Sequence, residues 1–374
     1  MQFIDLHEQY RLMEDSFKKR LDSILDSKQF IGGKEVSELE ARLAEYVGVK
    51  HVVACASGTD ALVIPMMAYG LKKTDAVFVP SFTFFASGES VSLAGGTPVF
   101  VDVDKNTFNI DIISLEEKIK EVKKEGKLDP RGVVAVDLFG QPAEHSRIRE
   151  IAEANNMFVL EDAAQGFGGN INGKKAASFG DVSGTSFFPA KPLGCYGDGG
   201  AIFTDDDELA AAMKSIHVHG QGTDKYDNVR IGLNSRLDAM QAAILLEKLA
   251  LFDGELEARN EIANYYTEKL SGIVKTPVVK DGYFSSWAQY TIQVKDAEER
   301  SMIIGALKEK GVPAMIYYPI PMHKSTAYKD DNAQCVLPVS EKLSQTVMSI
   351  PMHPYLKKQE QDLICDIISE AIAK

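Results

Sequence analysis

The stretch MFVLEDAAQ, residues 157–165, joins a short apolar run to two consecutive carboxylates. Its near-continuous Met, Phe, Val and Leu are typical of a strand buried on both faces of a parallel sheet. Ligands of open α/β sheets bind outside the carboxyl ends of the strands, so Asp162 stands where a ligand is expected. A carboxylate there can be a metal ligand, a base or the partner of a protonated heterocycle, and a helix N-cap is the alternative structural role.

Seven runs of this kind alternate with amphipathic stretches between His51 and about Asp205. Intervening stretches such as Ser114–Lys124 and Ser146–Asn155 have the apolar spacing of helices. This alternation predicts an α/β fold with a large, mostly parallel sheet. The predicted strands are His51–Ala56, Ala76–Pro80, Pro98–Val103, Gly132–Leu138, Met157–Glu161, Val182–Phe188 and Gly200–Thr204.

A long helical pattern follows the last predicted strand, from Ser235 to roughly Leu270. Ser235 and Asp238 are three residues apart and resemble a capping box at its start. Gly254 is expected to break this stretch into two helices. Pro65, in the helix after the first strand, is expected to kink that helix.

The pattern of apolar and polar residues changes after Lys275. Short apolar runs and helical stretches there indicate a smaller α+β unit. The unit ends in a helix predicted over Gln359–Ala373. We therefore expect a large domain over residues 1–250 and a small domain over residues 251–374, with about residues 1–20 packing on the small domain.

The composition restricts the class of protein. The 374 residues are 45% hydrophobic and 25% charged, as in ordinary globular chains. No apolar run reaches bilayer length and residues 1–7 lack a signal-peptide pattern, so we expect a cytoplasmic protein with no membrane partner. A net charge of −13 without basic blocks disfavours nucleic-acid binding. Reduced thiols rather than a zinc ribbon are expected of the widely spaced Cys55, Cys195, Cys335 and Cys365.

Two further segments carry candidate chemistry, whereas the motifs GxxxxGK[ST], GxGxxG, HExxH and GxSxG do not occur. Ser57-Gly58-Thr59-Asp60 follows a buried strand and opens a helix, so it either binds an anion or forms a plain capped turn. Residues 186–194 read SFFPAKPLG and place Lys191 after a buried apolar run. A buried lysine has a depressed pKa and is nucleophilic, and a solvated loop lysine is the alternative.

Together these segments resemble one family. The motifs SGT at 57–59, EDAAQ at 161–165, SFF at 186–188 with Lys191, and NSR at 234–236 stand in the order found in the DegT/DnrJ/EryC1/StrS sugar aminotransferases. The resemblance extends to FIDL at 3–6 and YPIPMH at 318–323, and so covers nearly the whole chain. It implies the pyridoxal 5′-phosphate (PLP)-dependent transferase fold type I, as in aspartate aminotransferase. It also implies a seven-stranded large domain, a smaller C-terminal α+β domain, and a homodimer with shared active sites.

The resemblance also assigns roles to residues. Lys191 is expected to form a Schiff base with PLP, and Asp162 to pair with the protonated pyridine nitrogen. Gln165 is expected to contact the ring hydroxyl, and Phe82 to stack on the ring. The phosphate is expected to be bound by Gly58, Thr59, Ser186 and, from the neighbouring subunit, Asn234.

The region around Asn234 indicates which class of sugar substrate the resemblance implies. It is similar to the branch that aminates C3 of nucleotide-linked 3-keto sugars with L-glutamate as donor. Residues 186–201 are especially similar to UDP-2-acetamido-2-deoxy-3-keto-glucuronate aminotransferases, which supply surface polysaccharides such as O-antigen. Arg236 is expected to bind the C6 carboxylate or to pair structurally with Asp238, and Tyr318 and His323 are expected near the sugar.

Several alternatives remain open. The chain could aminate a dTDP-3-keto-6-deoxyhexose or a 4-keto sugar, or could be a catalytically silent regulatory relative. A sugar dehydratase is the other enzyme alternative, but such relatives carry a histidine where this chain has Lys191. A silent relative is expected to have lost Lys191 or Asp162, and both are present. No spacing of histidines with carboxylates or cysteines favours a metal site.

Overall fold

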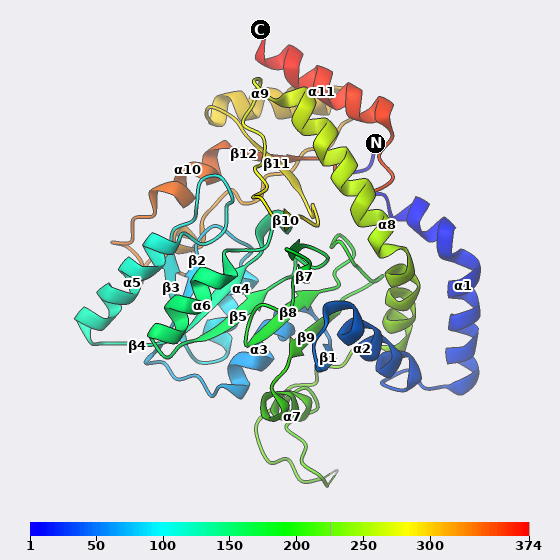
Figure 1. The fold of residues 1–374 in the computed structure, drawn as a ribbon, viewed down its shortest axis with the longest axis vertical. Coiled ribbons are helices and arrows are strands. Elements are labelled where there is room, and N and C mark those ends of the chain that lie inside the picture. Colours follow the sequence, from blue (N-terminus) through cyan, green and yellow to red (C-terminus); the bar gives the residue numbers. More distant parts are fainter. Residues whose placement is uncertain (225, 374) are drawn as a thin grey trace.

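A seven-stranded sheet forms the centre of the molecule in the computed structural model, which describes residues 1–224 and 226–373 (Figure 1). Strand β9 runs antiparallel to both of its neighbours, and the other neighbouring pairs are parallel. The mostly parallel α/β sheet predicted from the sequence is therefore confirmed. From edge to edge the strands are β1 (His51–Cys55), β9 (Gly200–Thr204), β8 (Val182–Ser186), β5 (Phe158–Asp162), β4 (Asp129–Val136), β2 (Asp75–Pro80) and β3 (Thr97–Val101).

Helices cover both faces of this sheet, so alternate residues of one strand enter different cores. Val77 and Val79 of β2 pack with α3, α4 and α7, whereas Ala76 and Phe78 pack with α5 and α6. This two-sided burial explains why the strands read as continuous apolar runs. The helices are α3 (Gly58–Ala68), α4 (Ala86–Leu93), α5 (Ile112–Glu125), α6 (His145–Ala154) and α7 (Asp207–Ile216).

The long helix α8 (Ala239–Leu270) is continuous, so the predicted break at Gly254 is wrong. Gly254 is exposed and a Cβ there would meet nothing within 4 Å, so its cost of about 1 kcal/mol is easily offset by the buried face. The predicted capping box is also wrong, because Ser235 lies outside the helix and its Oγ donates to Asp60. The helix α3, in contrast, contains Pro65 within its bounds.

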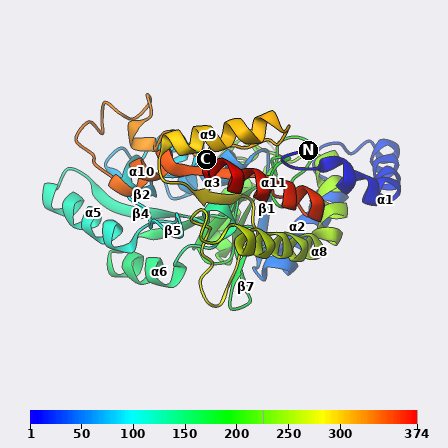
Figure 2. The same cartoon turned by 90° about the horizontal axis from the view of Figure 1, so that it is seen from above.

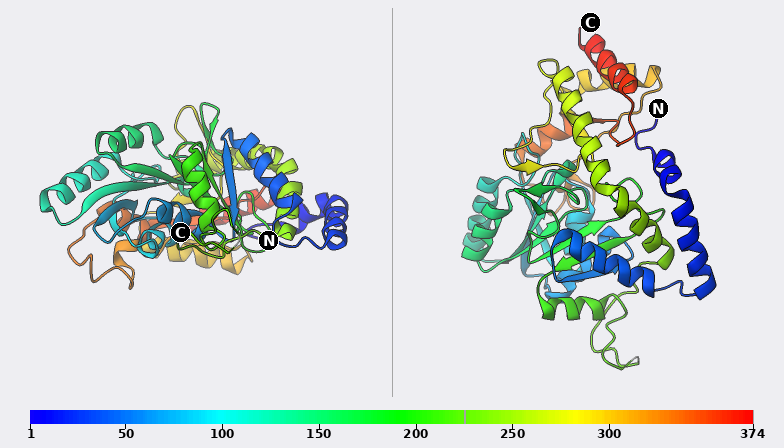
Figure 3. Two further views of the ribbon diagram at one scale, coloured as in Figure 1. Left: turned by 90° about the horizontal axis from the view of Figure 1, so that it is seen from below. Right: turned by 45° about the vertical axis from the view of Figure 1, so that its right-hand side comes forward.

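Two N-terminal helices that the sequence analysis did not predict, α1 (Leu6–Ser27) and α2 (Lys34–Val47), pack against α8 (Figure 3). Gln9 of α1 donates to both carboxylate oxygens of Glu255, and Arg20 forms a 2.7 Å ion pair with Glu247. The N-terminal segment is therefore fixed along α8.

A second core, formed by residues of α8, α9, α11, β11 and β12, lies at the C-terminal end of α8. Figure 2 shows these helices from above. Leu256 is the last residue of α8 in the core beside the large sheet, and Ile262 is the first in this second core. We propose that the two domains divide along α8, near the expected boundary at residues 250–251. The remaining elements are η1 (Leu138–Gly140), β6 (Asn170–Ile171), β7 (Lys174–Lys175), β10 (Tyr283–Phe284), β11 (Tyr290–Gln293), α9 (Ala297–Glu309), η2 (Met322–Lys324), α10 (Pro338–Thr346), β12 (Val347–Ile350) and α11 (Lys358–Ile372).

No helix in the described part of the chain is both long and apolar enough to span a membrane.

Candidate active site

The N-terminus of α3 forms a cradle suited to an anion. Ser57 caps the helix by accepting the N–H of Asp60 through its Oγ at 3.1 Å. The N–H groups of Gly58 and Thr59 have no acceptor among the described residues, as is usual in a first helical turn. Ser186, at the end of β8, lies so close that a Cβ on Gly58 would stand 2.5 Å from its Cβ. Two free N–H groups beside a hydroxyl make a donor set that fits a phosphate dianion.

Glycines on the neighbouring strands allow this close approach. A Cβ on Gly184 of β8 would lie 2.7 Å from the Ala61 carbonyl oxygen of α3. A Cβ on Gly200 of β9 would lie 2.4 Å from the carbonyl oxygen of Ser57. Any larger residue would push the helix away from the sheet, so these glycines fix the position of the cradle.

Asp162 ends β5 and is 5% exposed. Its Oδ2 accepts the hydroxyl of Ser87 at 2.7 Å, and its Oδ1 accepts the N–H of Ala164 at 3.2 Å. Burial raises the pKa of Asp162, while these two hydrogen bonds and the charge of Lys191 oppose the rise. A carboxylate fixed in this way at a strand end can hold a proton on a heterocyclic nitrogen.

Lys191 lies in the turn after β8, where its N–H donates to the carbonyl of Phe188. Desolvation lowers the pKa of its ammonium group, and attraction to Asp162 acts in the opposite direction. The amine has no hydrogen-bond partner within the described part of the chain. A desolvated amine held near a single carboxylate has the properties of a nucleophile and proton carrier.

Gln165 and Tyr318 are joined beside this pair. Gln165 accepts the N–H of Phe139 through Oε1 and donates through Nε2 to the Tyr318 hydroxyl at 2.9 Å. Burial raises the pKa of Tyr318, so the phenol stays protonated and can act as a donor. The structure therefore places both predicted residues at one polar position near Asp162.

The predicted stacking of Phe82 is not supported, because the residue has no exposed surface. Its ring is in edge contact with the rings of Phe139 and Tyr318, as part of the core. Phe84, two residues later, is 54% exposed, and its ring centre lies 6.2 Å from that of Tyr318. Phe84 was not predicted, because three phenylalanines occur within four residues and only burial distinguishes them.

The predicted sugar contact of His323 is wrong. Its side chain is fully buried, with Nδ1 at 2.7 Å from the Ser81 hydroxyl and Nε2 at 3.0 Å from Glu341. Both ring nitrogens are thus occupied, and the imidazole joins the end of β2 to α10. Ser87, in contrast, was not predicted from the sequence but contacts Asp162 in the structure.

Asn234 and Arg236 flank Ser235, which is hydrogen-bonded to Ala56 and Asp60 at the start of α3, and they do not join the hydrogen bonds of Asp162 or Gln165. Both are exposed, and Arg236 donates through Nε to the Asn234 side-chain oxygen at 2.8 Å. They line an open hollow whose other lining residues include Asp198 and Gln241, but not Lys191, Asp162 or Gln165. The arginine does not pair with Asp238 by any ion pair in the described residues.

A lysine and a carboxylate at the strand ends, above a helix N-terminus that fits a phosphate, define a PLP-dependent enzyme of fold type I. The chain belongs to the DegT/DnrJ/EryC1/StrS aminotransferase family, whose sequence model matches residues 12–369.

Known proteins of this family resemble the chain over its full length. It is 44% identical to the UDP-2-acetamido-2-deoxy-3-oxo-D-glucuronate aminotransferase of Pseudomonas aeruginosa, covering 98% of each chain. It is 40% identical to a pleiotropic regulatory protein of Geobacillus stearothermophilus, covering 98% of this chain and 97% of that one. The crystal structure of a family aminotransferase from Brucella abortus has a TM-score of 0.97 at 48% identity, with complete coverage of both chains.

Proposed function

We propose that this enzyme transfers the amino group of L-glutamate to C3 of UDP-2-acetamido-2-deoxy-3-keto-glucuronic acid. The observation that carries the proposal is the arrangement of Lys191 in the turn after β8 and the buried Asp162 at the end of the neighbouring strand β5. The substrate is supported by the 44% identity to the Pseudomonas aeruginosa enzyme over nearly the whole chain.

The residues of one chain fit the phosphate and the ring nitrogen of PLP. The N–H groups of Gly58 and Thr59 and the hydroxyl of Ser186 would hold its phosphate, and Asp162 its ring nitrogen. Phe84, the exposed phenylalanine, is the better candidate for the ring face. When bound, PLP supplies an electron sink for negative charge at the carbon that bears the amino group.

The protein's own groups would then divide the remaining work. Lys191 Nζ, whose pKa is lowered by desolvation, can take up a proton and return it within the same turnover. The Gln165–Tyr318 pair would direct a donor toward the ring hydroxyl. Ser87 would keep Asp162 in place and ionised through its hydrogen bond.

We propose further that the active form is a cytoplasmic homodimer, in which Asn234 and Arg236 complete the site of the second subunit. Both side chains are exposed in the single chain. Large apolar residues near them in the sequence are also exposed, with Val229 at 54% and Ile231 at 85%. Exposed apolar residues that lie close together on one loop fit a surface that a second chain covers. Arg236 of the second subunit would bind the sugar carboxylate, and the product would serve O-antigen synthesis.

The test separates the two half-reactions. Purified enzyme is reconstituted with PLP, and L-glutamate is added while the aldehyde absorbance of the cofactor is recorded. Candidate keto sugars are then added one at a time, including the UDP-linked uronate, a dTDP-3-keto-6-deoxyhexose and a 4-keto sugar. Return of the band fastest with the uronate supports the proposal, and faster return with another sugar contradicts it.

A regulatory function is the second candidate, and the 40% identity to a regulatory protein favours it. It predicts no spectral change with any amino donor. The same experiment therefore distinguishes an enzyme from a silent relative.

A further inference from the structure

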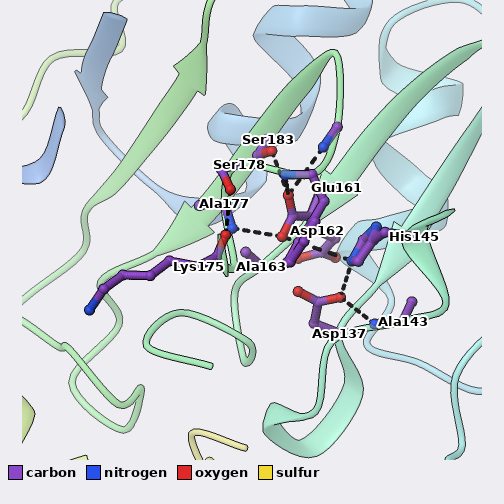
Figure 4. A network of polar contacts seen from close by, with 12 residues as sticks. Asp137, Ala143, His145, Glu161, Asp162, Ala163, Lys175, Ala177, Ser178 and Ser183 are labelled. Carbon is purple, nitrogen blue, oxygen red and sulfur yellow. Dashed lines mark hydrogen bonds and ion pairs between the residues drawn. The ribbon is translucent and has the colours of Figure 1, made fainter. Parts of the chain in front are cut away.

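Three buried titratable side chains lie directly behind the cofactor carboxylate. Glu161 precedes Asp162 on β5, so the two side chains point to opposite faces of the sheet. Behind the sheet Glu161 meets Asp137 and His145, and Figure 4 shows the three pointing toward one another. Asp137 and Glu161 have no exposed surface, and His145 is 4% exposed. None of the three enters the chemistry proposed above.

Glu161 is fully occupied by hydrogen-bond donors. Its two oxygens accept the N–H groups of Ala177, Phe179 and Gly180 and the hydroxyl of Ser183. This carboxylate therefore holds the segment between β7 and β8 and has little capacity for a further ligand.

Asp137 is connected to both polar cofactor residues. Its N–H donates to the main-chain carbonyl of Asp162 at 3.1 Å. Its Oδ1 accepts the N–H of Ala143 at 2.8 Å, which closes the loop that carries Phe139. Phe139 in turn donates its N–H to Gln165 Oε1 at 2.7 Å. A displacement of Asp137 is therefore transmitted to Asp162 through the backbone and to Gln165 through one hydrogen bond.

His145 fixes the Asp137 carboxylate. Its Nε2 lies 2.7 Å from Asp137 Oδ1, and its ring stacks on Phe179 with the centres 4.6 Å apart. The other oxygen, Oδ2, is pressed against Gly166, where an added Cβ would stand only 2.5 Å away. That close contact, together with the bond to His145, holds the Asp137 carboxylate in one orientation.

We propose that Asp137 and His145 are positioning residues that set the placement of Asp162 and Gln165 against the ring nitrogen and ring hydroxyl of PLP. The inference rests on the proposed function only in taking Asp162 and Gln165 as the ring contacts. The phosphate cradle is formed by α3 and β8 and not by these two residues. Asp137 and His145 are therefore expected to control the electronic state of the bound ring and not the affinity for PLP.

The experiment uses the holoenzyme with three variants. His145→Phe keeps the stack on Phe179 but loses the Nε2 hydrogen bond to Asp137, and His145→Gln returns an amide that can form a hydrogen bond near the same place. Ser183→Ala is the matched control, since it removes a buried hydrogen bond to Glu161 but no contact of Asp137. The measurements are the absorption spectrum of bound PLP, its dissociation constant, the rates of both half-reactions and the melting temperature.

We expect His145→Phe to shift the bound-cofactor spectrum and slow both half-reactions about 10- to 100-fold, as for a small misplacement of a catalytic group. The PLP dissociation constant should stay within about threefold, because the phosphate carries most of the binding. His145→Gln should restore most of the rate and spectrum. Ser183→Ala should lower the melting temperature without changing either.

Two results would overturn the inference. One is a His145→Phe enzyme with unchanged spectrum and rates, and the other is a Ser183→Ala enzyme with the same spectral shift. If His145→Phe does not fold, Asp137→Asn is used, and it should produce a smaller shift in the same direction. An unshifted Asp137→Asn spectrum then overturns the inference. Failure of the proposed function would appear differently, as a wild-type enzyme without amino transfer from glutamate.

Discussion

The interior group around Asp162 and Lys191 differs sharply from the exposed pair Asn234 and Arg236. Asp162 is held by Ser87 and Ala164 from the same chain. Asn234 and Arg236 contact each other and line an open hollow. One chain thus supplies the groups proposed for the PLP ring, whereas the exposed pair is proposed to contribute to the site of a second subunit. The chemistry of the interior group should therefore be fixed by the fold, and the choice of sugar by the exposed pair.

The largest expected effect lies in the interior group. Lys191→Ala removes the desolvated amine and should abolish turnover, together with any cofactor bond that borohydride can trap. The exposed Lys214→Ala on α7 is the control and should behave as wild type. Steady-state assays and mass spectrometry after reduction check both outcomes. A fully active Lys191→Ala enzyme would contradict the mechanism as a whole.

The next effect concerns the Asp162 charge. Asp162→Asn can still accept the Ser87 hydroxyl, but it cannot stabilise a positive charge on the ring nitrogen. We expect kcat to fall by about 10²- to 10³-fold, the usual cost of removing one preorganised electrostatic group. Rapid-kinetic rates of the glutamate half-reaction measure this directly. A rate within a few-fold of wild type would remove Asp162 from this role.

A smaller and more selective effect is expected at the exposed pair. Arg236→Lys keeps the charge but loses the planar fork that matches a carboxylate. For the uronate, kcat/KM should fall by about 10- to 100-fold, the loss of one charge-assisted hydrogen bond. The glutamate half-reaction should change little, and Arg42→Lys, at an exposed position of α2, should change neither. Equal losses in both half-reactions would assign Arg236 a structural role.

The oligomeric state also tests the difference between the interior group and the exposed pair. If Asn234 completes the site of a second subunit, sedimentation should show a dimer, and dilution below its dissociation constant should lower activity. Its interface should bury on the order of 2,000 Å² or more, as in obligate pairs. A fully active monomer would show that each chain builds its whole site.

The sequence predicted the interior group better than its surroundings, for physical reasons. Continuous apolar runs fix strands buried on both faces, and all seven strands of the large sheet were found. The end of a strand then fixes where Asp162 lies. Side-chain burial, in contrast, depends on tertiary packing, so the expected ring contact of Phe82 is not supported and the expected sugar contact of His323 is wrong. Gly254 was misread because a local propensity of about 1 kcal/mol is outweighed by the buried face of α8.

The smallest expected effect distinguishes the roles of Phe82 and Phe84, two phenylalanines in the loop after β2. Phe84 is 54% exposed beside Tyr318, whereas Phe82 has no exposed surface. Phe84→Leu should weaken PLP binding about 2- to 10-fold, the worth of one aromatic contact, and leave stability nearly unchanged. Phe82→Leu should do the reverse, lowering the free energy of unfolding by on the order of 1–2 kcal/mol through a core cavity. Equilibrium PLP titration and chemical denaturation of both variants measure the two quantities. Weaker PLP binding in Phe82→Leu alone would restore Phe82 to the ring face and show that the loop after β2 rearranges when the cofactor binds.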